Sequence, residues 1–252
     1  MKRLIHIPAL LCSLAAMGQF GFSTASLDPA KLLPVLFDAA PTGKLNEVKW
    51  KPDFGERQHL PTVTDPFVYT RVDTTFYLTS AKDKAVVVFR TYVPEQTEDA
   101  GMCAACTEHI GVALFNQTVD FRTKAKSWFL TSFHKWLMEQ GIHEVRLPVQ
   151  LVQLGKEFRA LRIDSSEGDE VQRTTSANFF ELGADRPILH VEMNGIHMSG
   201  VGMDMTEEVV ERQIKILPSA KEMFDVEVRT AGDPKPAVYV YDPTTLGYGR
   251  KN

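Results

Sequence analysis

Long apolar runs, catalytic signatures and a dominant charge sign are all scarce in this sequence, and each shortage excludes something. After residue 17 no apolar run approaches the ~20 residues of a membrane-spanning helix, so no membrane span is expected after processing. No G-x-S-x-G, H-E-x-x-H, phosphate-binding glycine loop or dinucleotide fingerprint is present. The 28 Lys and Arg are balanced by 32 Asp and Glu, and the one basic cluster, Arg122 to Lys126, is small. We therefore expect no nucleic-acid partner.

The N-terminus has the features of a secretory signal. A basic start at Lys2 and Arg3 precedes an apolar run over residues 4–17, and small residues follow at Ser23 and Ala25. This pattern predicts a signal peptide over residues 1–25, with cleavage after Ala25 and a periplasmic or secreted protein. An uncleaved anchor is the alternative. Cys12 follows two leucines where a lipidated cysteine requires a small residue, so a lipoprotein is not expected.

The processed chain is predicted to be mainly β. Residues 26–60 are rich in Pro and Asp and are expected to form an extended arm with at most one helical turn, over the apolar stretch 32–37. Residues 61–252 are expected to form a single, mostly β domain. From Phe67 onward, short β-branched and aromatic runs alternate with turn residues, as in Phe224–Thr230. The turns at 154–157 and 231–234 predict antiparallel hairpins. The fold class is therefore an antiparallel meander, propeller-like or a sandwich, with one or two short helices. The candidates for these helices are Ser127–Gly141 and Thr206–Leu217, and each of them suits a strand equally well.

Two cysteines remain after processing, Cys103 and Cys106, in a C-x-x-C arrangement. An oxidising compartment favours a disulfide between them, which would stiffen the segment before a core strand. A redox-active pair requires a helix after the first cysteine, whereas a strand is expected here, and haem attachment is excluded because residue 107 is Thr. Metal binding by both thiolates with His109 stays open as an alternative.

A second cluster combines thioether and imidazole groups. Soft sulfur together with imidazole suits copper, and the nearby glycines would allow a segment to fold round an ion. Filling of a hydrophobic core by methionine is the alternative. The candidate ligands are Met193, His197, Met198, Met203 and Met205, with His190 on the strand that leads to them.

Several of these motifs together resemble a group of uncharacterised exported bacterial β proteins, in which a C-x-x-C precedes a strand and a propeller-like meander follows. The matching strings are Cys103 to Cys106, Ile110 to Phe115, Trp128, Val149 to Gly155, Phe224 to Val228 and Val240 to Asp242. The resemblance spans residues 85–242 and implies fold and compartment but no activity. Members often have a histidine directly after the first cysteine, where this chain has Ala104, so the resemblance implies no metal role for that position.

These observations favour an exported, non-catalytic binding or scaffolding protein that recognises a cell-envelope protein or a small ligand through its loops. The first alternative is a copper-binding or thiol–disulfide redox factor that uses the C-x-x-C. The second is a hydrolase whose catalytic groups are scattered and leave no local signature. For a binding or scaffolding protein, no resident cofactor is expected.

Overall fold

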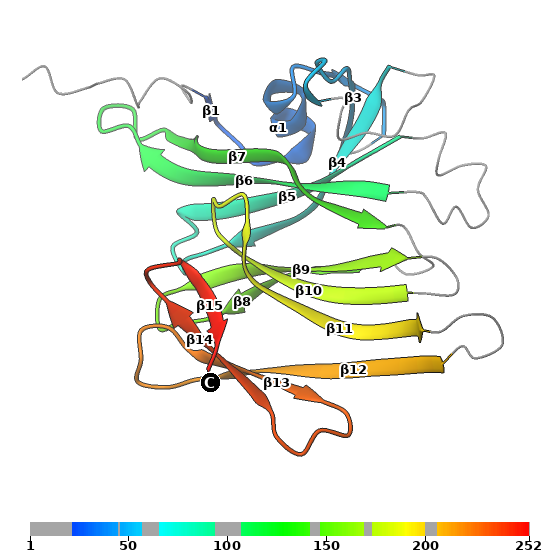
Figure 1. Cartoon of the computed structure of the whole chain (residues 1–252). Coiled ribbons are helices and arrows are strands. Elements are labelled where there is room, and N and C mark those ends of the chain that lie inside the picture. Colours follow the sequence, from blue (N-terminus) through cyan, green and yellow to red (C-terminus); the bar gives the residue numbers. More distant parts are fainter. Residues whose placement is uncertain are drawn as a thin grey trace, which may run out of the picture.

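The computed structural model describes residues 22–44, 46–56, 66–93, 107–141, 147–168, 173–199 and 206–251. It contains one helix and two large antiparallel sheets, placed one above the other in Figure 1. The mainly β, antiparallel fold class predicted from the sequence is confirmed. No helix among the described residues has the length and apolar character that crossing a membrane requires.

The first seven strands form the N-terminal sheet, in the order β1-β7-β6-β5-β4-β3-β2. Its long strands follow one another as a meander, and the two-residue β1 adds to the outer edge of β7. The strands are β1 (Ser23–Thr24), β2 (Ala40–Pro41), β3 (Glu47–Trp50), β4 (Val68–Tyr77), β5 (Lys84–Tyr92), β6 (Thr107–Val119) and β7 (Lys126–Gly141).

The remaining eight strands form the C-terminal sheet, in which every strand pairs with its neighbours in the sequence. These strands are β8 (Val149–Gln153), β9 (Arg159–Gly168), β10 (Arg173–Glu181), β11 (Pro187–Ser199), β12 (Thr206–Leu217), β13 (Asp225–Thr230), β14 (Ala237–Asp242) and β15 (Gly247–Arg250).

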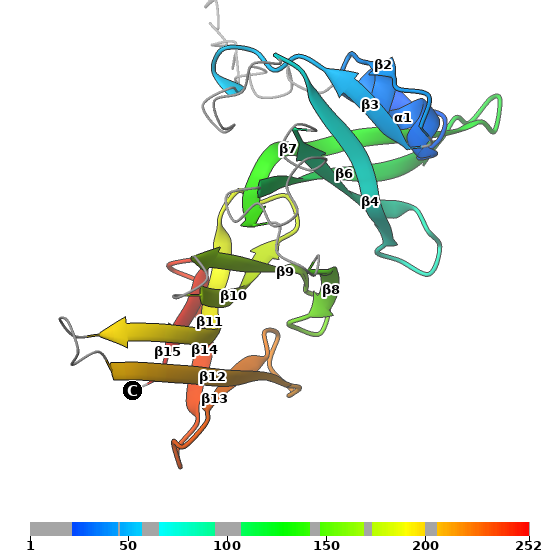
Figure 2. The same cartoon turned by 90° about the vertical axis from the view of Figure 1, so that its right-hand side faces the viewer.

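The helix α1 (Pro29–Leu36) covers one face of the N-terminal sheet, which we call the helix face (Figure 2). Asp28 caps the helix by accepting a hydrogen bond from the Ala30 amide, and Pro29 occupies the first turn, where its missing N–H costs nothing. Leu32 and Leu33 are fully buried against Phe89 and other side chains of that face. Residues 26–60 thus differ from the expected extended arm, because these apolar side chains complete the core of the sheet.

The opposite face of the N-terminal sheet packs on the C-terminal sheet, and we call it the interface face. Val86, Val88 and Ile110 from the first sheet share one hydrophobic cluster with Leu161 and Ile163 from the second. All five are at most 1% exposed. Of the arrangements expected from the sequence, the structure therefore has two packed sheets rather than a set of small propeller blades.

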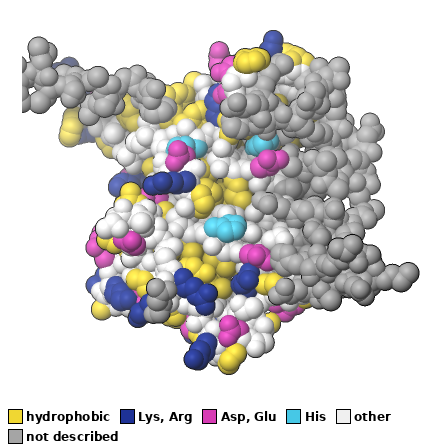
Figure 3. Space-filling model, viewed as in Figure 1, with side chains coloured by type: hydrophobic (Ala, Val, Ile, Leu, Met, Phe, Trp, Pro, Cys, Tyr) yellow, Lys and Arg dark blue, Asp and Glu magenta, His cyan; other side chains and the backbone are white. Residues whose placement is uncertain are grey.

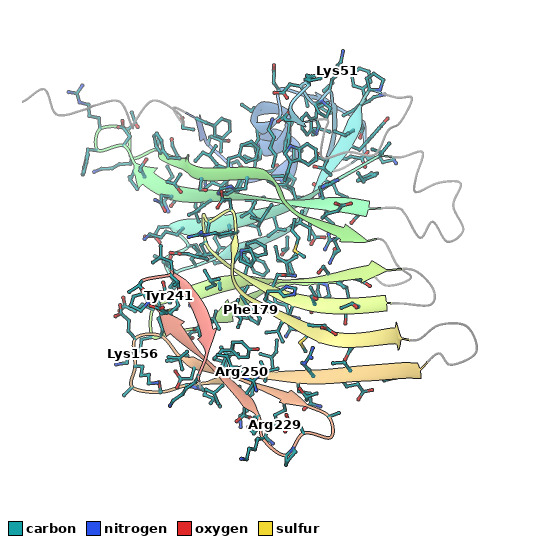
Figure 4. All side chains as sticks on the ribbon, in the orientation of Figure 1. Lys51, Lys156, Phe179, Arg229, Tyr241 and Arg250 are labelled. Atoms are coloured by element: carbon teal, nitrogen blue, oxygen red, sulfur yellow. The ribbon has the colours of Figure 1, made fainter. Side chains whose placement is uncertain are left out.

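The far part of the C-terminal sheet folds back over its own hydrophobic side. Val226 and Val228 on β13 pack in one cluster with Phe179 on β10, which is labelled where the sheet turns back in Figure 4. Tyr248 on β15 donates a 2.9 Å hydrogen bond to the carbonyl of Phe224. Burial raises the pKa of the Tyr248 phenol well above its ordinary value, so this donor keeps its proton.

Both segments proposed as helices are strands. Residues 127–141 lie within β7 and residues 206–217 form β12. In β7 the helix-like spacing of the apolar residues comes from two register shifts against β6, between Ile110 and Val112 and between Leu114 and Phe115. A bulge adds a residue to one strand, so the alternation of faces slips locally and imitates a longer period.

Candidate functional site

The two ends of the N-terminal sheet differ in character. At the loop end, β5 finishes at Tyr92, β6 begins at Thr107 and β7 finishes at Gly141. At the hairpin end, tight turns join β4 to β5 and β6 to β7. In Figure 1 the loop end lies on the right, together with the ends of β9 and β11 and the starts of β10 and β12. Cys103 and Cys106 belong to the segment that joins β5 to β6 on this side, and the second motif runs from β11 into the segment that joins β11 to β12.

The predicted ligands do not come together among the described residues. Cys103, Cys106, Met203 and Met205 lie outside the described part of the chain, so the disulfide stays a prediction. His109 is buried, and its ring meets the Trp136 ring edge-on at 5.2 Å on the helix face.

The second motif is divided within its own strand. Met193 packs against the hydrophobic core of the C-terminal sheet, which matches the core-filling alternative. For His197 and Met198 only the backbone is described, and it pairs with Glu208 and Glu207 of β12. The strands next to the two motifs, β6 and β11, belong to different sheets and do not pair with each other.

The most unusual group at the loop end is a buried charge network centred on Arg90. Arg90 is 1% exposed and continues the row of Val86 and Val88 on the interface face. Its Nε lies 2.9 Å from Asp73, which a bulge in β4 directs toward it, and its Nη1 lies 3.2 Å from Glu108 on β6. The guanidinium is thereby held between two carboxylates, which offset the cost of burying its charge.

The same network ties the two sheets together. Arg90 also donates to the Gln140 side chain on β7 and, through Nη2, to the Leu147 carbonyl at 2.9 Å. The Gln140 amide in turn donates to the carbonyl of Asp164 on β9 of the C-terminal sheet. Because Nη1 and Nη2 of Arg90 both donate to protein groups, the role of Arg90 in this geometry is to hold the two sheets together.

A row of aromatic and cationic side chains continues from this network toward β3. Arg71 is 2.9 Å from Glu108 and lies over the Tyr92 ring, 5.1 Å from its centre. Tyr92 stacks on Tyr69 with ring centres 6.0 Å apart, and Lys49 lies 5.5 Å from the centre of the Tyr69 ring. We call Lys49, Tyr69, Tyr92 and Arg71 the aromatic–cationic row; all except Tyr92 are partly exposed.

Tyr92 anchors the row at its buried side. Its hydroxyl donates to Glu47 on β3, and Glu47 also accepts a 2.8 Å hydrogen bond from Thr42. Burial, followed by the hydrogen bond to Glu47, raises the pKa of the Tyr92 phenol well above its ordinary value. Tyr92 therefore stays a neutral donor, and the flat ring keeps a fixed position for its neighbours.

One serine–histidine pair among the described residues invites a catalytic interpretation, and its geometry argues against it. Ser132 Oγ lies 2.9 Å from His134 Nε2 on β7. The same Nε2 lies 2.9 Å from the Gly183 carbonyl oxygen, an atom that only accepts hydrogen bonds. Nε2 must therefore carry a proton, whereas a base for the serine would present a bare nitrogen. The pair instead fastens the turn between β10 and β11 to the N-terminal sheet.

The described residues bring no three His, Cys, Asp or Glu side chains together as metal ligands. One histidine is nevertheless oriented for such a role. Asn178 donates to the Ile163 carbonyl, which fixes its amide, and its oxygen lies 2.7 Å from His190 Nδ1. Nδ1 is therefore the nitrogen that donates to Asn178, which leaves Nε2 of this exposed residue as the nitrogen for a metal. Figure 3 shows histidines and hydrophobic side chains near the middle of one face of the molecule.

Comparisons of the chain with protein-family models, with curated proteins and with solved structures find no match. The resemblance to exported C-x-x-C proteins accordingly stays a prediction, and the site rests on its own geometry.

Proposed function

We propose that this chain is an exported, periplasmic binding or scaffolding protein whose recognition surface is the loop end of the N-terminal sheet. The observation that carries the proposal is the aromatic–cationic row, in which Lys49, Tyr69 and Arg71 are partly exposed while Tyr92 is held from beneath. Exposed aromatic and arginine side chains on a rigid support are the groups that dominate recognition of partners.

The charge balance around the row suggests the chemistry of the partner. Glu108 pairs with both Arg71 and Arg90, so the charge of Arg71 already has a partner. A ligand would therefore contact the outer edge and the flat face of the Arg71 guanidinium rather than an unpaired cation. A planar or apolar group with an acidic substituent would meet the rings and the outer edge of Arg71 at once. Rigidity favours such binding, because the row need not be ordered when the ligand arrives.

The main alternative is a copper-binding or thiol–disulfide redox factor. The orientation of His190, an exposed residue whose Nδ1 is held by Asn178, is the structural observation in its favour. A hydrolase finds less support, since the Ser132–His134 pair has the wrong tautomer for general-base catalysis.

The test places a photo-crosslinking amino acid at Tyr69 and, as a matched control, at Tyr241, another partly exposed tyrosine on the C-terminal sheet. After export in intact cells, position 69 should yield a discrete crosslinked product that position 241 does not, and Arg71→Ala should weaken it at least severalfold. Equal products at both positions, or none, would contradict a recognition surface at the loop end.

A second experiment, on the purified protein, distinguishes the binding or scaffolding function from the copper or redox function. Its thiol titre, reduction potential and bound copper are measured after mild oxidation and after reduction. An unreactive disulfide without metal dismisses the copper or redox function. One copper per chain, or a potential near those of disulfide-exchange catalysts, would overturn the proposed function instead.

A further inference from the structure

The hairpin end of the N-terminal sheet carries a second surface that the proposed function does not use. The turn between β6 and β7 places Phe121 at its tip with 92% of the side chain exposed. Asp120 holds that turn by accepting hydrogen bonds from the backbone N–H groups of Arg122 and Thr123 and from the Thr123 hydroxyl. A large hydrophobic side chain is thus presented to solvent at the tip of an ordered hairpin.

Basic side chains surround this tip. Residues 77–84 and 117–128, which form the two neighbouring turns and their flanks, contain five Lys or Arg and two Asp or Glu, a local charge of 5 − 2 = +3, on a chain of formal charge −4. The two turns are adjacent, because Lys84 pairs with Asn116 and the Gln117 amide donates to the Asp83 carbonyl at 2.7 Å. The basic residues are Lys82, Lys84, Arg122, Lys124 and Lys126, and all are exposed.

Further apolar surface lies within the same end. Val119 beside the turn is 48% exposed, Tyr77 at the end of β4 is 42% exposed, and Phe129 on β7 is 40% exposed. Aromatic tips ringed by lysine and arginine match the interface of an anionic lipid bilayer, where the rings enter the headgroup region and the cations remain among the phosphates.

The course of the chain favours a bilayer over another anionic partner. β1 pairs with β7 at Trp128 and Phe129, and the Leu130 amide donates to the Phe22 carbonyl. Only residues 18–21 separate Phe22 from the apolar run that ends at Met17, a reach of at most about 18 Å. Until the predicted cleavage after Ala25, an apolar run held in the membrane would keep this part of the sheet near the lipid surface.

We propose that the hairpin end of the N-terminal sheet, with Phe121 at its tip, is a peripheral membrane-binding face for anionic phospholipid. This contact orients the molecule with its hairpin end on the bilayer and its loop end directed away from it. A recognition surface at the loop end would then face the aqueous compartment.

The test measures flotation of the protein, purified as the exporting cell leaves it and with its N-terminus defined by intact mass, with lipid vesicles. Vesicles of phosphatidylglycerol and phosphatidylcholine are compared with phosphatidylcholine alone. The wild type should bind the anionic vesicles and be released by 0.5 M salt. Arg122→Gln/Lys124→Gln/Lys126→Gln should lower the partition coefficient by about a hundredfold, at roughly fivefold per charge. Lys215→Gln/Lys235→Gln/Lys251→Gln, which removes three exposed charges from the C-terminal sheet, should bind like the wild type.

A second pair of variants tests insertion of the tip. Phe121→Trp should show a blue-shifted emission component on adding anionic vesicles that Phe54→Trp, at a site 94% exposed on another segment, does not show. Equal loss of binding in both triple variants, equal emission changes at 121 and 54, or no preference for anionic lipid would overturn the proposal. None of these outcomes bears on crosslinking at Tyr69, so the two proposals fail separately.

Discussion

Arg90 is the side chain on which the junction of the two sheets depends most. It is 1% exposed and contacts Asp73, Glu108, Gln140 and the Leu147 carbonyl. Arg90→Met would remove the cation that Asp73 and the buried Glu108 share, although Arg71 would still contact Glu108. We expect it to lower the free energy of unfolding, measured in urea, by about 3–5 kcal/mol.

The control for this prediction is an arginine pair on the surface. Arg229 lies 2.7 Å from Glu227, but its side chain is 64% exposed, so Arg229→Ala should change the free energy of unfolding by at most about 1 kcal/mol. Arg90→Lys keeps the charge but loses the forked geometry and should fall between the two. If Arg90→Met were as stable as Arg229→Ala, the Arg90 network would contribute nothing to the free energy of unfolding.

At the scale of single residues, the sequence could not reveal this network. Asp73, Arg90, Glu108 and Gln140 each stand alone in their own strand, where a charged or polar residue usually marks the solvent face. Only the pairing of β4 through β7 brings them together. The cysteine and methionine motifs attract notice because they are local, whereas the aromatic–cationic row is assembled from three strands.

The pairing of β5, β6 and β7 depends on a glycine at the register shift. Gly111 lies opposite Phe89, and a Cβ there would stand 2.0 Å from the Phe89 ring and 2.6 Å from the Lys135 carbonyl oxygen. We expect Gly111→Ala to lower the free energy of unfolding by about 3 kcal/mol or more. Adding Phe89→Leu should not restore stability, because the Lys135 oxygen belongs to the backbone and cannot rotate away.

Gly249 on β15 supplies the matched comparison. A Cβ at Gly249 would meet nothing within 4 Å, so Gly249→Ala should leave stability unchanged or raise it by about 0.5 kcal/mol. Similar urea midpoints for the two alanine variants would contradict the close packing at Gly111.

At the scale of elements, regular hairpins were predictable and irregular ones were not. The alternation in Phe224–Thr230 and the turn at 154–157 correspond to β13 and to the β8–β9 hairpin. β7 was ambiguous because its bulges break the alternation that identifies a strand. The sequence predicted α1 as no more than one helical turn because the helix is short and contains Pro34, and its stability comes from burying Leu32 and Leu33 rather than from helix propensity.

At the scale of the whole molecule, the interface cluster joins two sheets that each possess a further hydrophobic core of their own. Sharing Val86, Val88 and Ile110 with Leu161 and Ile163 means that neither sheet can open without exposing apolar surface of the other. The Arg90 network adds a polar tie at the loop end, and His134 and Ser132 fasten the turn between β10 and β11. These contacts predict one cooperative unit rather than two.

The distribution of tryptophan makes this cooperativity measurable. Trp50, Trp128 and Trp136 all belong to the N-terminal sheet, so their fluorescence reports that sheet alone, whereas far-UV circular dichroism reports both.

Val226→Ala removes a fully buried side chain from the core of the C-terminal sheet and should lower the free energy of unfolding by about 2 kcal/mol. We expect the urea midpoint from tryptophan fluorescence to fall by the same amount as the midpoint from circular dichroism. Val209→Ala, at a site 59% exposed on β12, should move neither. A fluorescence transition that stays in place while the dichroism splits into two steps would mean that the sheets unfold independently, because the loss in one core would not have reached the other.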